Sequence, residues 1–282
     1  MLSRYLRAFM QSPGGVLEMP AAMDIIASSG TQINTTLAAT TIESGDSFTV
    51  KNAALSSDAW LVQAWAYNQV AGMMRVRSAK LHDNVDAIRA RVQASIVQPL
   101  LPTGVMQKLW PQDTLIVELA GSNVAGDIEF VVLQLYYADL PGQAGRFQTA
   151  DYVKGRMKNL VGVRSQITLL TSGAYGTAKA LNADADLLKA NTDYAVLGMT
   201  TDKRVAGIFL RGPDTGNLRV GVPGELTPIE DFSCWFRNLG LSYNLPLIPV
   251  INSANKGATL IDCLADKNGG TANITVWLAE LG

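Results

Sequence analysis

Apolar and polar residues alternate over many short stretches of the chain, and a period of two predicts β-strands. The clearest stretch is 127–137, in which Ile128, Phe130 and Val132 share one face. Groups rich in Gly, Asn, Pro and Ser separate the stretches, at residues 44–45, 121–123, 213–216 and 268–270. Many short strands joined by such turns predict β-sandwiches of the jelly-roll type.

Similar words recur in the same order in the two halves of the chain. Residues 58–62 (DAWLV) resemble 193–197 (DYAVL), and 70–74 (VAGMM) resemble 205–209 (VAGIF). Both pairs are about 135 residues apart, and a period of this length indicates two copies of a whole domain. Two further pairs, about 145 residues apart, continue the series in the same order: 114–116 (TLI) with 259–261 (TLI), and 128–131 (IEFV) with 274–277 (ITVW).

The repeat divides the chain into four predicted segments. The predicted fold is all-β, with two tandem eight-stranded jelly rolls, short loop helices and an N-terminal amphipathic helix. The predicted boundaries are an N-terminal arm over 1–24, a first jelly roll over 25–142, a linker over 143–159 and a second jelly roll over 160–282.

One loop helix is expected at a corresponding place in each half. In residues 83–96 the apolar side chains are spaced three or four apart, at Val85, Ile88, Val92 and Ile96. In the second half, Thr227 is a candidate N-cap, and Phe232, Trp235, Phe236 and Leu239 follow at helical spacing. The alternative that either segment is another strand stays open.

The N-terminal residues predict a short basic amphipathic helix that ends at residues 13–15 (PGG). Arginines interrupt the apolar run that a signal peptide requires. The helix either packs on its own domain or forms an arm that grips a neighbouring subunit or a membrane surface. The residues assigned to this arm are Leu2, Arg4, Tyr5, Leu6, Arg7 and Phe9.

Charge and composition exclude several classes of function. Of the 282 residues 17% are charged, and 23 Lys and Arg nearly balance 24 Asp and Glu, so the chain is not a general polyanion binder. The single histidine, His82, excludes multi-histidine metal sites and hence a two-cupin enzyme. The only cysteines, Cys234 and Cys263, are expected to be buried free thiols. Low charge also predicts a surface that is largely covered by other subunits.

The remaining candidates for chemistry are weak. Residues 182–186 carry Asp184 and Asp186 in the manner of a calcium loop, but lack its glycine and distal glutamate. Asp127, Glu129 and Asp139 could pair, yet Asp127 and Glu129 lie on the strand face opposite Ile128 and Phe130, which predicts solvent or interface positions. His82, next to Asp83, has no nucleophile nearby in the sequence. We therefore expect no enzyme activity and no catalytic, cofactor-binding or metal-binding residue.

Two similar jelly rolls in tandem behind an amphipathic arm resemble the double jelly-roll major capsid proteins of icosahedral, membrane-containing viruses, of the corticovirus and tectivirus kind. The resemblance covers almost the whole chain and rests on architecture, since the repeated words show duplication only. It implies a structural protein of the virion capsid that assembles in the host cytoplasm as pseudo-hexameric homotrimers. The partners it implies are neighbouring capsomers and minor or penton capsid proteins, with no specific nucleic acid. It places the arm at the inner face and leaves an internal membrane or membrane protein open as its partner.

A β-sandwich that binds carbohydrate or a receptor, or a tail protein of a phage, is the alternative function. Trp60, Trp65 and Trp110 would then serve as platforms for sugars. An exposed cluster of tryptophans on one loop rim would favour this alternative.

Overall fold

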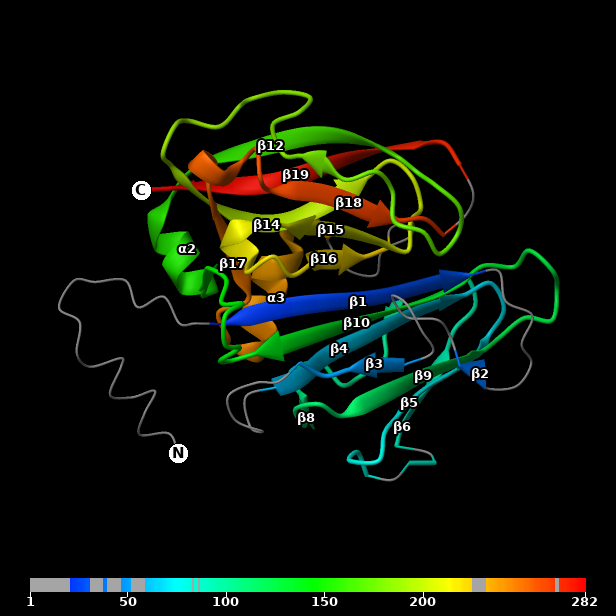
Figure 1. Cartoon of the computed structure of the whole chain (residues 1–282). Helices are drawn as coiled ribbons and strands as arrows, with labels where there is room; N and C mark the ends of the chain where they lie inside the picture. The colour runs from blue at the N-terminus through cyan, green and yellow to red at the C-terminus, as the bar shows by residue number, and fades with distance from the viewer. Residues whose placement is uncertain are drawn as a thin grey trace, which may run out of the picture.

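The computed structural model describes residues 21–30, 38–39, 47–51, 59–82, 84–85, 87–224, 232–266 and 269–282. In these ranges the chain forms four antiparallel sheets, two from each half, with a few short helices (Figure 1). The assigned residues of the N-terminal arm, from Leu2 to Phe9, lie outside the described residues.

The first half builds two sheets that pack face to face. One sheet has the order β1-β10-β4-β7, with β8 also paired to β4, and the other has the order β2-β9-β5-β6, with β3 also paired to β9. The strands are β1 (Ala22–Gly30), β2 (Ala38–Ala39), β3 (Ser47–Thr49), β4 (Ala59–Asn68), β5 (Gly72–Arg77), β6 (Ile88–Val92), β7 (Gln98–Pro99), β8 (Gln107–Leu109), β9 (Thr114–Ala120) and β10 (Glu129–Tyr137).

The second half repeats this arrangement, with sheet orders β11-β17-β14-β19-β12 and β13-β18-β15-β16. Its strands are β11 (Phe147–Gln148), β12 (Met157–Thr168), β13 (Lys179–Ala180), β14 (Asp193–Thr201), β15 (Gly207–Arg211), β16 (Val220–Pro223), β17 (Ile248–Asn252), β18 (Leu260–Leu264) and β19 (Thr271–Leu281). Its helices are α2 (Ala150–Arg156) and α3 (Trp235–Tyr243), with 3-10 turns η2 (Pro213–Thr215), η3 (Phe232–Cys234) and η4 (Ser253–Asn255).

Both halves have the strand order of a jelly roll. For the comparison, β2 and β3 count as one strand, β7 and β8 count as another, and β11 is left out. Each half then has eight strands, with one sheet in the order 1-8-3-6 and the other in the order 2-7-4-5. The repeated words lie on equivalent strands: VAGMM covers the start of β5, and VAGIF covers the start of β15. The predicted fold class, all-β sandwiches of the jelly-roll type, is confirmed.

The described residues form two apolar cores, one inside the first sandwich and one that extends from the second half onto the first. The residues of β10 alternate between Val131, Leu133 and Leu135, which face the core of the first sandwich, and Phe130 and Val132, which belong to the core of the second half. Every residue of β10 is therefore buried, because both faces of its sheet are covered. The sheet β1-β10-β4 is the layer between the two cores (Figure 1).

The two predicted loop helices have different outcomes. The prediction for residues 83–96 is wrong, because residues 88–92 form strand β6, in which Arg89 and Arg91 are exposed, Ile88 and Ala90 are half-buried and Val92 is buried. Val85, which helped to set the helical spacing, is 67% exposed. The helix of the second half is present as α3, which buries Trp235, Phe236 and Leu239. The proposed cap Thr227 lies outside the described residues.

Residues 143–159, predicted as a linker, contain regular structure. They include β11, α2 and the first residues of β12, and Thr149 caps α2 by accepting a hydrogen bond from the N–H of Tyr152. Strand β1 begins at Ala22, slightly ahead of the predicted start of the first jelly roll. Within the described residues, the helices are all too short or too polar to span a membrane.

Candidate assembly surfaces

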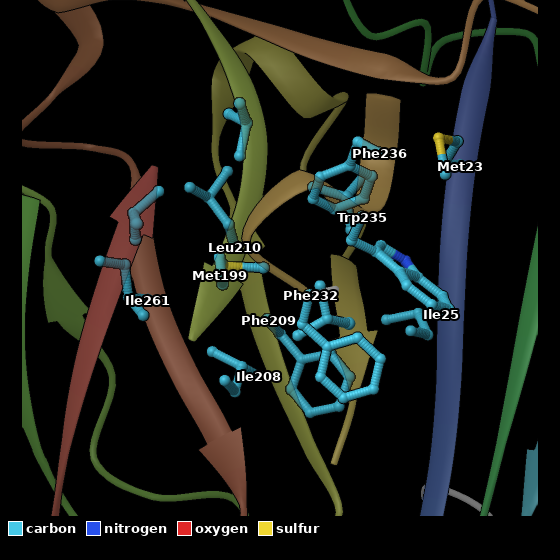
Figure 2. Packing of buried hydrophobic residues seen from close by; sticks show 14 of the residues in the cluster. Met23, Ile25, Met199, Ile208, Phe209, Leu210, Phe232, Trp235, Phe236 and Ile261 are labelled. Atoms are coloured by element: carbon cyan, nitrogen blue, oxygen red, sulfur yellow. The ribbon is translucent and has the colours of Figure 1, made fainter. Parts of the chain in front are cut away.

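The contact between the two halves is an apolar interface built on the outer face of the sheet β1-β10-β4. The rings of Trp65 on β4 and Trp235 on α3 are 4.8 Å apart, and both side chains are buried. Figure 2 shows the indole of Trp235 beside Ile25 of β1. The backbone N–H of Ile25 donates to the carbonyl of Arg219, just before β16, at 2.9 Å. The edge of β1 is thus covered by the edge of the second half.

Polar contacts close one end of this interface. The Arg204 guanidinium donates to the Tyr67 hydroxyl at 2.9 Å and lies over the Tyr67 ring. The same guanidinium is paired with the Asp266 carboxylate. The Ser29 hydroxyl donates to the carbonyl of Ala265 at 2.5 Å. These bonds join the loop between β14 and β15 and the residues that follow β18 to β1 and β4 of the first half.

The repeated segment Val-Ala-Gly is buried in the second half, whereas its first two residues are exposed in the first half. In the second half Val205 and Ala206 are fully buried at the corner that contacts the first half. Their counterparts in the first half are Val70, which is 44% exposed, and Ala71, which is also exposed. A shallow pocket of about 320 Å³, lined by Ala71, Gly72, Met73 and Arg91, lies beside them. Within the described residues, this corner of the first half therefore lacks the burial that its counterpart in the second half has.

The other side of the interface shows the same difference. With the repeat separation of about 135 residues, the counterpart of Ile25 on β1 is Leu160 on β12. Ile25 is fully buried by the second half, whereas Leu160 is 54% exposed. Each side of the internal contact therefore has an exposed counterpart elsewhere on the molecule.

Strand β12 is an edge strand, and side chains cover only part of its free edge. The N–H of Gln166 donates to Asp184, and the carbonyl of Gln166 accepts from the Lys179 ammonium. Hydrogen-bonding groups alternate in direction along a strand, so the N–H and C=O groups of Leu160 and Arg164 point to the same free edge as those of Gln166. Exposed edges of this length are favourable sites for pairing with another chain.

The acidic residues considered for metal binding have other roles in the structure. Asp184 is paired with Lys179, and Asp186 with Lys256, so these carboxylates have cations as partners. The hydrogen bond from Lys179 lowers the pKa of Asp184, and that from Lys256 lowers the pKa of Asp186. Across the described ranges there is no group of three or more His, Cys, Asp or Glu side chains that could hold a metal ion.

Three other sequence predictions, on the carboxylates, on His82 and on the cysteines, can be compared with the structure. Glu129, expected at a solvent or interface position, is only 1% exposed, because both faces of β10 are covered. Asp127 is half-buried and bonded to the Ser122 hydroxyl, and Asp139 is half-buried. His82 is exposed, and Asp83 lies outside the described residues. Both cysteines are free thiols, but only Cys263 is buried, and Cys234 is half-buried.

The three tryptophans of the carbohydrate alternative lie in separate surroundings. Trp65 is buried against Trp235, Trp60 packs beside Tyr136, and Trp110 lies under the Lys108 ammonium. Trp65 and Gln63 line a pocket of about 200 Å³ between β4 and α3. None of the three tryptophans lies exposed on a loop rim.

Comparisons with known proteins find no matching family model and no matching curated protein. Among solved structures, the PBSX exported protein XepA has a TM-score of 0.27 at 12% identity, covering 94% of this chain and 89% of that one. The major capsid protein P2 from bacteriophage PM2 has a TM-score of 0.21 at 8% identity (93% and 98% covered), and the STIV MCP has 0.21 at 7% (93% and 88%). At such low TM-scores the similarity carries no inference about function.

Proposed function

We propose that this chain is a structural protein, a capsid-type double jelly roll that assembles head to tail into homotrimers of an icosahedral viral shell. The observation that carries the proposal is the exposure of Leu160 and Val70, whose equivalents Ile25 and Val205 are fully buried. Ile25 lies beside Trp235 of the second half, and Val205 follows Arg204, which contacts Tyr67 of the first half. The proposal assigns no catalytic role to any residue.

The internal contact supports a specific proposal for how copies join. Its first side is the outer face of the first-half sheet around Ile25, and its second side is the second-half corner around Val205. The two sides are complementary, so their counterparts are expected to be complementary as well. The Leu160 surface of one copy would then receive the Val70 surface of the next copy. Such a contact is heterologous, and it forms a closed ring where the rotation closes.

The closed ring that we propose for this two-domain chain is a trimer. Three chains contribute six similar sandwiches, and a ring with near-identical contacts within and between chains is a pseudo-hexagonal tile. The free edge of β12 adds backbone groups that a neighbouring strand can pair with, as β1 is joined to the segment before β16. A surface with 17% charged residues suits a protein whose sides are covered by copies of itself.

In the assembled shell the remaining partners are those that the family resemblance implies. They are neighbouring capsomers, minor or penton capsid proteins and, at the inner face, a surface contacted by the arm residues Leu2 to Phe9. The virion is the proposed location, with assembly in the host cytoplasm.

Two single substitutions, Leu160→Asp and Val70→Asp, test the head-to-tail contact. Light scattering should give a mass of about three chains for the wild type and one chain for each variant, because a buried unpaired carboxylate is costly. An equimolar mixture of the variants keeps one intact interface per pair, so it should form dimers and no trimers. An interface built from one self-complementary patch would not show this behaviour.

The control is Leu241→Asp on α3, which introduces the same charge at a side chain that is 53% exposed and lies outside both surfaces. It should remain trimeric, and circular dichroism should show that all variants are folded. A monomeric wild type, or trimers that persist in both Leu160→Asp and Val70→Asp, would show that the proposed contact is wrong.

A further inference from the structure

Glu129 and Asn68 form a buried polar pair at one end of the first sandwich. They are directly opposite each other on β10 and β4, and they are 1% and 0% exposed. Both side chains lie against Gly121, where an added Cβ would be 2.6 Å from Glu129 Oε1 and 2.9 Å from Asn68 Nδ2. The pair is therefore enclosed by backbone on the side of β9.

One oxygen on each of the two opposed side chains has no donor. Glu129 Oε1 accepts from the N–H of Ser122 at 3.1 Å, and Asn68 Nδ2 donates to the carbonyl of Ala120 at 3.0 Å. Glu129 Oε2 and Asn68 Oδ1 are buried and have no partner. Buried acceptors are almost always satisfied, since an unmade hydrogen bond is costly there. A further hydrogen between the two side chains would satisfy both oxygens at once.

The electrostatic surroundings favour the neutral form of Glu129. Burial raises its pKa, the hydrogen bond from Ser122 acts in the opposite direction, and the Asp127 carboxylate raises it further. Asp127 is the one charged side chain that acts on Glu129 within the described part of the chain. The residues directly opposite on the adjacent strands, Asn68 on β4 and Gly30 on β1, bring no charge.

We propose that Glu129 carries a proton in the folded protein and donates it from Oε2 to Asn68 Oδ1. One proton then satisfies both unpartnered oxygens and removes the charge from a packed interior. Loss of that proton leaves a buried carboxylate that has no counter-ion among the described residues and whose Oε2 has no donor.

The pair supports the surface around Val70, so its protonation also bears on assembly; this consequence rests on the proposed function. An added Cβ at Gly72 would be 2.7 Å from Asn68 Nδ2 and 1.8 Å from the Ala120 carbonyl oxygen. Asn68 thus lies directly beneath residues 70–72, which form one side of the proposed contact between copies. Deprotonation of Glu129 should loosen this corner and weaken the ring.

The sign of the pH dependence follows from linkage. The pKa of Glu129 in the folded protein lies above its ordinary value of 4.5, so the folded protein binds the proton more tightly than the unfolded chain. The contribution of the neutral pair to stability is complete below pH 4.5. This contribution is lost as the pH rises through the raised pKa of Glu129. The melting temperature should then fall by up to roughly 3 °C per pH unit.

Glu129→Gln tests the proposal, because its amide supplies the donor to Asn68 at every pH while its oxygen still accepts from Ser122. Melting temperatures are measured in EDTA between pH 5 and pH 9 for the wild type, Glu129→Gln and the control Glu118→Gln. The wild type and the control should lose stability as the pH rises, and Glu129→Gln should lack that loss and melt above the wild type at pH 9. Parallel pH profiles for the wild type and Glu129→Gln would overturn the proposal.

Two further measurements keep the outcome decisive. Infrared spectra of the wild type at pH 7 should contain the band of a buried neutral carboxylic acid, and its absence overturns the proposal even where Glu129→Gln does not fold. Calcium chloride at pH 8 should leave the melting temperature of the wild type unchanged, whereas a rise that Glu129→Gln lacks would show a cation in place of the proton. Light scattering across the same pH range tests the link to assembly. A wild type that is monomeric at every pH would contradict the proposed function, but it would not contradict the proposal that Glu129 is protonated.

Discussion

Trp235→Ala is expected to destabilise both halves of the molecule together. Trp235 is fully buried, with its ring centre 4.8 Å from that of Trp65 in the first half and 5.2 Å from that of Phe232. A buried tryptophan removes about 150–250 Å² from water, worth about 4–6 kcal/mol at the usual coefficient, and this is an upper bound. Because core truncations of this size cost about 3–5 kcal/mol in practice, we expect a loss of about 4 kcal/mol.

Trp235→Phe is the matched control. It keeps an aromatic ring against Trp65 and Phe232, and it removes an indole N–H that is buried without a partner. The lost packing and the removed unsatisfied donor act in opposite directions, so the cost should stay below about 1.5 kcal/mol.

Urea unfolding followed by circular dichroism measures both effects. One cooperative transition should shift to lower urea concentration in Trp235→Ala, because the apolar core that contains Trp235 extends into the first half. A cycle of Trp65→Ala and Trp235→Ala, which removes the contact between the two rings, should give a coupling of about 1 kcal/mol. Two separate transitions, of which only one moves, would refute the shared core.

Two further predictions concern the first sandwich. Burial alone would raise the pKa of Glu118, but its bonds to Arg75 and Arg77 outweigh burial and lower the pKa. Glu118→Gln should therefore lower the free energy of unfolding by about 2 kcal/mol at pH 7, and by less as the pH falls below 4.5. An equal loss at pH 7 and pH 4 would contradict this. Gly72→Ala should cost about 2 kcal/mol or more, since its Cβ would lie 1.8 Å from the Ala120 carbonyl oxygen. Gly155 in α2 has open space around it, so Gly155→Ala should instead raise the free energy of unfolding by about 0.5–1 kcal/mol. Equal unfolding midpoints for Gly72→Ala and Gly155→Ala would contradict the packing argument.

Local patterns predict strands well in this protein and one helix poorly. The alternation in 127–137 correctly indicates β10, because a period of two is a property of the strand itself. Residues 83–96 carry two patterns at once, since Val85, Ile88 and Val92 suit a helix while Arg89 and Arg91 suit the exposed face of a strand. Pairing of β6 with β5 decides between them, and that pairing depends on a neighbour that the local sequence does not contain.

The environment of Glu129 could not be predicted from its own strand. Alternation correctly separates it from Ile128 and Phe130, but it cannot tell which face of a strand meets the core. Here both faces are buried, one by the first sandwich and one by the second half. Two adjacent apolar sets, around Phe130 and Val131, are the signal that could have indicated this.

The sequence by itself determined the strand pattern, the duplication and the absence of multi-histidine chemistry, since these depend on local order and on residue counts. Only the tertiary structure decided which copy of each repeated surface is covered. Val70 and Val205 occur in the same word, yet one is 44% exposed and the other is buried. The physical reason is that a chain with two copies has one internal contact between them, which leaves one side of each copy without a partner.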